Sequence, residues 1–359
     1  MKPDKYGIDS HKLHYHTERI EQWKKAPHET FPIYIEISPV GYCNHRCTFC
    51  AVDYLGYKTI RLNKEVLIPA IRNMAQNGVK SIMFAGEGEP LLHPHISEII
   101  NETARAGIKV GITTNGVALT GKLVQKCMQS ISWIKVSMNG GSTSYEKIHV
   151  TREEDYERVW RNIELAADWK DMCPEVRTVL GIQTVLLPEN AQDIEELAGR
   201  ARDTGLDYLV VKPYSQHKKS LTTKYSGITY SPYKGLFTRL REFNTDKFEV
   251  IAREQAMDSW DEPGRAYSKC YSTPYFWAYV MATGDVYGCS AYLNDPQFCY
   301  GNIKKERFED IWLGDKRREC AEYVRERLCI DDCRKNCRME KVNRYLWDLM
   351  HPNPHKDFI

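Results

Sequence analysis

Short β-branched runs alternate with amphipathic helical stretches through the first two thirds of the chain, and this alternation restricts the fold more than any other feature. Each of six strand-like runs precedes a segment with helical periodicity or a polar loop. A β-then-α order makes consecutive strands parallel, with right-handed crossovers. Six units are too few to close an eight-stranded barrel, so we predict an α/β fold built on a partial (β/α)6 TIM-like barrel. The predicted strands cover 33–38, 81–86, 109–115, 133–139, 180–187 and 207–214, and the predicted helices cover 63–77, 94–106, 120–130, 153–169 and 190–204.

Polar residues follow the ends of five of these strands. The first strand leads into "GYCNHRCTFC", the second into "GEGEP", the third ends in "TTNG", the fourth in "SMNGG", and the sixth leads into "KPYSQHKK". In parallel α/β folds the functional site forms at the carboxyl ends of the strands. Packing alone does not explain polar groups at five strand ends, so we predict a site there.

The composition of the chain divides it into four regions. The region from 266 onward is rich in cysteine, and "WAYVMATGDVYGCS" (277–290) predicts a hairpin that turns at Gly284. The predicted regions are a helical extension over 1–32, the barrel core over 33–215, a bridge segment over 216–265, and a small C-terminal domain over 266–359 that ends in an amphipathic helix.

The charge and hydrophobicity of the chain exclude several classes of protein. With 50 basic and 48 acidic residues the net charge is +2, which gives no general reason for nucleic-acid or membrane binding. No apolar run approaches the roughly 18 residues that a membrane span needs, and the N-terminus lacks the apolar core of a secretory signal. We therefore expect a cytoplasmic protein, in which twelve cysteines indicate metal binding rather than disulfides.

Three cysteines, Cys43, Cys47 and Cys50, lie within ten residues after the first strand. A closed zinc site or a four-cysteine cluster leaves no coordination position open, whereas three ligands do. This spacing can hold three irons of a cubane 4Fe-4S cluster and leave the fourth iron free to bind a small molecule. Zinc held by the three thiolates and a distant histidine, such as His45, is the alternative.

The CxxxCxxC pattern, with Phe49 as its aromatic residue, resembles that of the radical S-adenosylmethionine (SAM) superfamily. "GEGEP" resembles the superfamily's Gly-Gly-Glu-Pro segment, with Glu87 in place of the second glycine, and "TTNG" resembles a segment near the methionine and ribose of SAM. The resemblance extends from about residue 33 to 215. The SAM-binding residues that it implies are Phe49, Gly86, Glu87, Glu89, Pro90, Thr113, Thr114, Asn115, Ser137, Asn139, Arg152 and Gln183.

One of these positions, Asn139, departs from the usual pattern, and another, Arg152, has a specific expected partner. Asn139 stands where aspartate is common in the pair that binds the ribose hydroxyls, and Arg152 matches a basic residue aimed at the SAM carboxylate. The resemblance implies that an electron from an external donor such as flavodoxin or ferredoxin enters the cluster, that SAM is cleaved, and that a 5′-deoxyadenosyl radical abstracts hydrogen from the substrate. The protein then orients the cofactor and excludes competing reactions.

The C-terminal cysteines resemble those of the SPASM and twitch domains of the same superfamily, which carry auxiliary 4Fe-4S clusters. Cys270 and Cys289 fit the first half of the SPASM pattern, and the second half departs from it. If 329–345 is helical, Cys333 and Cys337 lie one turn apart on one face. We predict one auxiliary cluster held by Cys270, Cys289, Cys333 and Cys337, with Cys329 in reserve and structural zinc as the alternative.

The resemblance leads to a main hypothesis about the reaction. Lys212, Tyr214 and His217 lie at or just beyond the end of the sixth predicted strand and predict a cationic rim suited to a carboxylate, phosphate or polyol. We therefore expect a radical SAM oxidoreductase or epimerase that acts on a small polar carbohydrate-like substrate, such as an aminocyclitol, sugar or nucleotide sugar. An epimerase needs a hydrogen donor, for which Cys299 and Cys320 are the candidates.

Two alternatives to this hypothesis stay open. The first is a radical SAM maturase that modifies a peptide or protein. Such maturases often carry a precursor-binding domain of about 80 residues, and only 32 residues precede the first strand here. The second is a protein without catalytic activity that holds iron-sulfur or zinc. The SAM-binding segments argue against this second alternative.

Overall fold

The computed structural model describes residues 4–358, and within them a single ten-stranded sheet organises the chain. The strands run in the order β10-β9-β8-β1-β2-β3-β4-β5-β6-β7. Their bounds are β1 Tyr34–Ile37, β2 Ser81–Phe84, β3 Lys109–Thr114, β4 Trp133–Ser137, β5 Val179–Leu186, β6 Tyr208–Pro213, β7 Glu249–Ala252, β8 Trp277–Val280, β9 Asp285–Tyr287 and β10 Cys299–Asn302.

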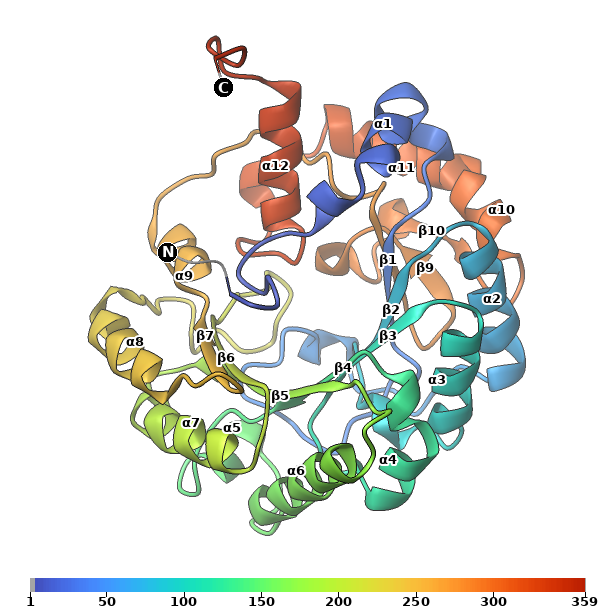
Figure 1. Ribbon diagram of the computed structural model, residues 1–359. Helices are drawn as coiled ribbons and strands as arrows, with labels where there is room; N and C mark the ends of the chain where they lie inside the picture. Colours follow the sequence, from blue (N-terminus) through green and yellow to red (C-terminus); the bar gives the residue numbers. More distant parts are fainter. Residues whose placement is uncertain (1–3, 359) are drawn as a thin grey trace.

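The helices cover the convex face of this sheet. Figure 1 shows the sheet curved into an open barrel, with α2, α3, α4, α6, α7 and α8 around its outside and α12 on the open side between β7 and the last strands. The helices are α1 Thr17–Lys25, α2 Lys64–Gln76, α3 Ile96–Arg105, α4 Gly121–Cys127, α5 Tyr145–His149, α6 Asp155–Met172, α7 Ile194–Asp203, α8 Lys234–Leu240, α9 Glu254–Asp261, α10 Phe308–Leu313, α11 Asp315–Glu326 and α12 Glu340–Met350.

The six predicted strands are confirmed as β1 to β6, and the five predicted helices as α2, α3, α4, α6 and α7. The predicted barrel was incomplete in one respect. A seventh parallel strand, β7, pairs with β6 inside the predicted bridge segment 216–265. This strand has only four residues and lies among polar turns, so its periodicity is too short to detect in the sequence.

The predicted hairpin is confirmed as β8 and β9, and Gly284 has φ +93 at its turn. The sequence did not predict where this hairpin docks. β8 pairs in parallel with β1, from Tyr34 opposite Trp277 to Ile37 opposite Val280. The C-terminal hairpin therefore continues the barrel sheet, and it lies directly beside the strand that leads into the cysteine loop.

Strand alternation divides the side chains between two environments. Ile134 and Val136 of β4 are buried against the helices, whereas Trp133, Lys135 and Ser137 face the interior of the barrel. Near the amino ends of the strands, the rings of Trp133 and Tyr208 line the interior. A Cβ atom on Gly111 would lie 2.3 Å from the ring of Trp133, so only glycine allows this ring to lie across the neighbouring strand.

A buried arginine fastens the C-terminal module to the barrel. Arg317 of α11 is fully buried, and its guanidinium donates to the backbone carbonyls of Trp312, Pro274 and His28. These carbonyls belong to three separate segments, which the arginine holds together. Within residues 4–358, no helix is both long and apolar enough to cross a membrane.

We expect Arg317→Met to lower the free energy of unfolding of the reconstituted protein by about 3 kcal/mol, because three buried carbonyls lose their donor. The neighbouring Arg318 is exposed and pairs with the exposed Asp315, so Arg318→Met is the matched control and should cost about 0.5 kcal/mol or less. Guanidinium denaturation followed by circular dichroism measures both values. Equal effects of the two substitutions would contradict the fastening role of Arg317.

Candidate functional site

The loop that follows β1 holds Cys43, Cys47 and Cys50, and all three line one large cavity inside the barrel. The loop is fixed by backbone hydrogen bonds to the short helix α5. The N–H of Arg46 donates to the carbonyl of His149 at 3.0 Å, and the N–H of Thr48 donates to that of Ile148 at 2.9 Å. The three thiols are therefore held by the backbone and not by contacts among themselves.

The three thiols fit a metal cluster by their chemistry. Burial raises the pKa of Cys43 to about 11, and burial followed by the charges of Cys50 and Cys43 raises the pKa of Cys47 well above its usual value. Three crowded thiolates therefore need a cation to neutralise them. Cys43, Cys47 and Cys50 would supply three ligands to a 4Fe-4S cluster.

Glu89 joins the loops after β2 and β3 beneath these cysteines. Its buried carboxylate accepts hydrogen bonds from Thr114 Oγ1 at 2.6 Å, from the N–H of Asn115 at 2.8 Å and from the N–H of Leu91 at 3.0 Å. Burial raises the pKa of Glu89 to about 7, and these donors oppose that rise. The predicted "GEGEP" and "TTNG" segments therefore form one connected structure.

The glutamate that departs from the superfamily pattern has a separate structural role. Glu87 accepts a hydrogen bond from the N–H of Ala282, in the turn between β8 and β9, at 2.8 Å. Its side chain is not among those that line the cavity. The preceding Gly86 has φ +111, and a Cβ atom there would lie 2.5 Å from the hydroxyl of Tyr279. The substitution therefore ties this loop to the C-terminal hairpin.

The predicted SAM-binding residues divide into two groups. Pro90 and Glu87 lie outside the cavity lining, Asn139 is buried in a side-chain network, and Arg152 is exposed. Because these four residues do not line the cavity, their roles in SAM binding stay predictions. The residues that do line the cavity are Phe49, Gly86, Glu89, Thr113, Thr114, Asn115, Ser137 and Gln183.

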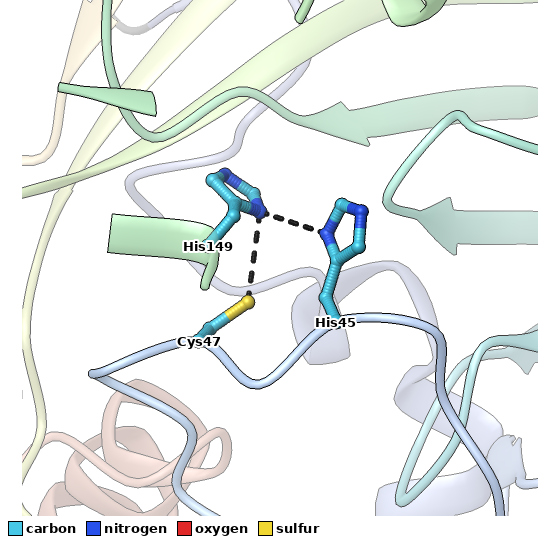
Figure 2. A group of neighbouring side chains, drawn as sticks. All are labelled: His45, Cys47 and His149. Carbon is cyan, nitrogen blue, oxygen red and sulfur yellow. Dashed lines mark hydrogen bonds between the residues drawn. The ribbon is translucent and has the colours of Figure 1, made fainter. Parts of the chain in front are cut away.

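Two buried histidines lie against Cys47, as Figure 2 shows. The sequence suggested His45 as a possible zinc ligand and gave no role to His149. His149 Nδ1 lies 3.1 Å from His45 Nδ1 and 3.6 Å from Cys47 Sγ. The backbone N–H of Asn139 donates to His149 Nε2 at 3.2 Å. In the neutral ring the proton must then reside on Nδ1, so it points toward His45 and Cys47. No sequence signal marked His149, because its role depends on its burial beside Cys47.

The contact with His149 also fixes which nitrogen of His45 carries the proton. His45 Nδ1 accepts from His149, so its own proton is on Nε2, which lies 3.6 Å from the Asp155 carboxylate. Burial lowers the pKa of His45 to about 4, and burial followed by the charge of His45 lowers that of His149 well below its usual value. Both rings are therefore neutral. His45, Cys47 and His149 are also close enough to one another to hold a metal ion, but this group differs from the zinc alternative of three thiolates and one histidine.

The cavity has a volume of about 2250 Å³ and runs through the interior of the barrel. Of the predicted substrate residues, Lys212 and Tyr214 line it, and His217 does not. Lys212 lies within β6, and strand alternation turns its side chain into the barrel. His217 instead stacks on Tyr54, with ring centroids 4.9 Å apart.

The C-terminal cysteines converge on a second, smaller cavity. Cys270, Cys289, Cys333 and Cys337 all line it, and Cys329 is exposed and lies outside it. Burial followed by the charges of Cys333 and Cys337 raises the pKa of Cys289 well above its usual value, so these thiols also need a cation. This set of four matches the predicted ligands of the auxiliary cluster.

The predicted helix over 329–345 was wrong in its first half. Residues 330–332 form a single 3-10 turn, Cys333 has an extended backbone, and the helix α12 begins only at Glu340. Three cysteines among charged and polar residues bring too little apolar surface to pack a helix. The cysteines reach one cavity through an irregular loop instead.

The remaining cysteines lie away from both cavities. Cys320 is buried on α11, and Cys299 on β10 lies 3.9 Å from the carbonyl of Gly301. Neither lines the barrel cavity, so the structure does not bring these hydrogen-donor candidates to the site. Cys127 is buried and Cys173 half-buried, as expected for ordinary thiols.

Comparison with known protein families decides what this arrangement is. The model of the radical SAM superfamily matches residues 37–201, and that of an iron-sulfur cluster-binding domain, SPASM, matches residues 270–338. The chain contains a radical SAM domain followed by a SPASM domain. The first domain implies a 4Fe-4S cluster with SAM at the first cysteine group, and the second implies auxiliary iron-sulfur clusters, which confirms the predicted cofactors.

Known relatives of this radical SAM protein carry out several reactions. It is 29% identical over 199 residues to GTP 3′,8-cyclase of Chlorobaculum tepidum, with 54% of this chain and 58% of the cyclase covered, so it spans less than two thirds of that relative. It is 21% identical over 304 residues to the tungsten-containing aldehyde ferredoxin oxidoreductase cofactor-modifying protein of Pyrococcus furiosus, covering 79% and 81%.

The solved structure of Streptococcus suis SuiB bound to S-adenosylmethionine has the same fold as this protein. The TM-score is 0.61 at 20% identity, with 84% of this chain and 68% of SuiB covered. The names of the three relatives do not support the expected carbohydrate-like substrate. They support a radical SAM enzyme without fixing the reaction class.

We expect the reconstituted wild-type protein to contain about eight irons, and Cys289→Ala to contain about four, because one cubane cluster is lost. Cys329→Ala is the matched control and should keep about eight, since Cys329 lies outside the cavity. Iron analysis and electron paramagnetic resonance (EPR) measure these values. Loss of iron in Cys329→Ala would show that the ligands are assigned wrongly.

We expect His149→Phe to make the midpoint potential of the N-terminal cluster more negative. The Nδ1–H beside Cys47 Sγ would be lost, and hydrogen bonds to ligating sulfurs stabilise the reduced cluster. An EPR-monitored redox titration in the Cys289→Ala background isolates this cluster. Exposed His14 provides the control His14→Phe, which should leave the potential unchanged. An equal potential in His149→Phe and the control would exclude this hydrogen bond.

Proposed function

We propose that this protein is a radical SAM maturase that oxidises a side chain of a peptide or protein inside the barrel cavity. One observation carries the proposal: the two cavities share a wall. Cys337, Ser290, Arg338 and Met339 line both the barrel cavity and the pocket of the four C-terminal cysteines. A substrate in the barrel therefore lies beside the auxiliary cysteines.

The size of the cavity supports a substrate larger than a sugar. Small-molecule pockets typically have volumes of about 300–1,000 Å³. The barrel cavity measures about 2250 Å³, which leaves room for a peptide segment beside SAM. SuiB, whose fold this protein shares, has also been solved bound to its precursor peptide SuiA. These points support the maturase over the carbohydrate enzyme that the sequence suggested.

The two cysteine groups would hold two clusters with different functions. When bound, the first cluster with SAM supplies a radical that abstracts a hydrogen atom, and the auxiliary cluster supplies a one-electron acceptor. Cys43, Cys47 and Cys50 would hold the first cluster. Thr113, Ser137 and Gln183 line the cavity and offer polar groups that would orient SAM.

In the proposed oxidation, the substrate loses one hydrogen atom to the radical. The substrate radical then loses one proton to water and one electron to the acceptor. Two hydrogens leave in all, and a new double bond forms between the carbon and its neighbouring atom. The acceptor position beside Cys337 makes this second step direct.

Anaerobic incubation with SAM, dithionite and a panel of peptides tests the proposal, with sugars and nucleotides as comparison substrates. We expect 5′-deoxyadenosine to rise with a peptide whose mass falls by two hydrogens. Cys47→Ala should form no deoxyadenosine. Cys289→Ala should still cleave SAM but leave the peptide unchanged, and Cys329→Ala should behave as wild type. A rise with sugars alone would overturn the peptide assignment, and full peptide oxidation by Cys289→Ala would overturn the role of the auxiliary site.

A further inference from the structure

Two lysines project into the interior of the barrel from strands that normally carry apolar or small residues there. Lys135 lies on β4 opposite Gly181, and Lys212 lies on β6 opposite Val185. Both line the main cavity, below the strand ends that carry the cysteine loop and Glu89. Buried ammonium groups are costly unless an anion pairs with them, so their presence calls for a reason.

Neither lysine has an ion pair or hydrogen bond with its side chain among residues 4–358. The Lys135 ammonium lies over the rings of Trp133 and Tyr208, at 5.3 Å and 5.8 Å from their centroids. Such contacts compensate only a part of the cost of burial. Burial followed by the charges of Arg338 and Arg253 lowers the pKa of Lys135 to about 7. Burial and the charge of Lys135 lower the pKa of Lys212 well below its usual value.

Three arginines extend this positive group, and two carboxylates offset it in part. Arg338 pairs with Glu36 at 2.9 Å, and Arg253 pairs with Asp9 at 3.5 Å. Arg334 has no carboxylate partner among the described residues, and it donates to the hydroxyl and carbonyl of Ser215 at 2.8 Å and 2.9 Å.

The five cations, Lys135, Lys212, Arg253, Arg334 and Arg338, all line the same cavity. Asp4 also lies near enough to act on Lys135 without pairing with it. Cations therefore exceed paired carboxylates in the middle of the barrel, and an anion entering there would relieve their mutual repulsion.

We propose that Lys135 and Lys212 bind an anionic group of the substrate, a carboxylate or a phosphate, in the middle of the barrel. This inference rests on the proposed function and names its substrate class: a peptide with an acidic side chain, a free C-terminal carboxylate or a phosphorylated residue. The anion anchors the substrate at depth, and the reacting carbon lies above it toward Cys47 and beside Cys337.

The sequence couples this anion site to the auxiliary cysteines. Arg334 and Arg338 directly follow Cys333 and Cys337 in the same loop. One loop therefore supplies two cysteines to the auxiliary pocket and two guanidinium groups to the wall of the barrel cavity. Binding of the anionic group and placement of the substrate beside the auxiliary pocket are then one event.

Isothermal titration of the reconstituted protein with inorganic pyrophosphate and with glutarate tests this site, with glycerol as the neutral probe. We expect Lys135→Met/Lys212→Met to weaken binding of at least one anion by about tenfold or more. The double variant should be at least as stable as wild type, because two buried cations are removed. Lys109, the exposed first residue of β3, lies outside the cavity, so Lys109→Met is the matched control and should bind as wild type does.

Amine labelling gives a second measurement that needs no substitution. Acetic anhydride should modify Lys135 and Lys212, and the anion that binds should protect both, whereas labelling of Lys109 should not change. Protection by glutarate alone assigns a carboxylate, and protection by pyrophosphate alone assigns a phosphate.

Three results would overturn the inference: binding of neither anion, unchanged anion binding in the double variant, or loss of SAM affinity in that variant with anion binding intact. The third result would assign the lysines to the SAM carboxylate. Because these experiments follow binding and not turnover, they can succeed where peptide oxidation fails, and the two failures stay distinguishable.

Discussion

Strand β1 makes hydrogen bonds on both of its edges, and the rest of the structure depends on this double pairing. β2 pairs with one edge and β8 with the other, both in parallel. The first edge starts the barrel, and the second attaches the C-terminal hairpin to the same sheet. Because β1 also leads straight into Cys43, the pairing fixes the cysteine loop, the barrel cavity and the auxiliary cysteines relative to one another. The two cysteine groups are distant in the sequence, and the pairing of β1 with β8 helps to bring them to one interior.

Much of the fold and part of the site could be predicted from the sequence. The βα alternation fixed β1 to β6, and the three-cysteine spacing together with "GEGEP" and "TTNG" located the site, because these signals are local. Contacts between distant segments could not be predicted. The docking of β8 on β1, the turn of Lys212 into the barrel, and the position of His149 beside Cys47 each depend on tertiary packing. The irregular loop of Cys333 and Cys337 was predicted wrongly, because helical periodicity of cysteines was taken for helical structure.

Burial shapes the electrostatics throughout the site. It raises the pKa of the crowded thiols and lowers the pKa of both histidines, so thiolates form only with a metal and the rings beside Cys47 stay neutral. In the middle of the barrel it also acts against Lys135 and Lys212, which have no carboxylate partners within residues 4–358. The charges of the interior are therefore compensated only when metal clusters bind the thiolates and an anion binds the two lysines.

The central claim is that the missing fourth cysteine leaves an iron atom open to SAM. Electron-nuclear double resonance on the reduced protein with SAM labelled with ¹⁵N in its amino group tests this claim most directly, in the Cys289→Ala variant that keeps only the first cluster. The account predicts a hyperfine coupling between the nitrogen and the cluster, and the same variant with Cys47→Ala added should show none. A reduced cluster in Cys289→Ala that binds SAM without any nitrogen coupling would contradict the account.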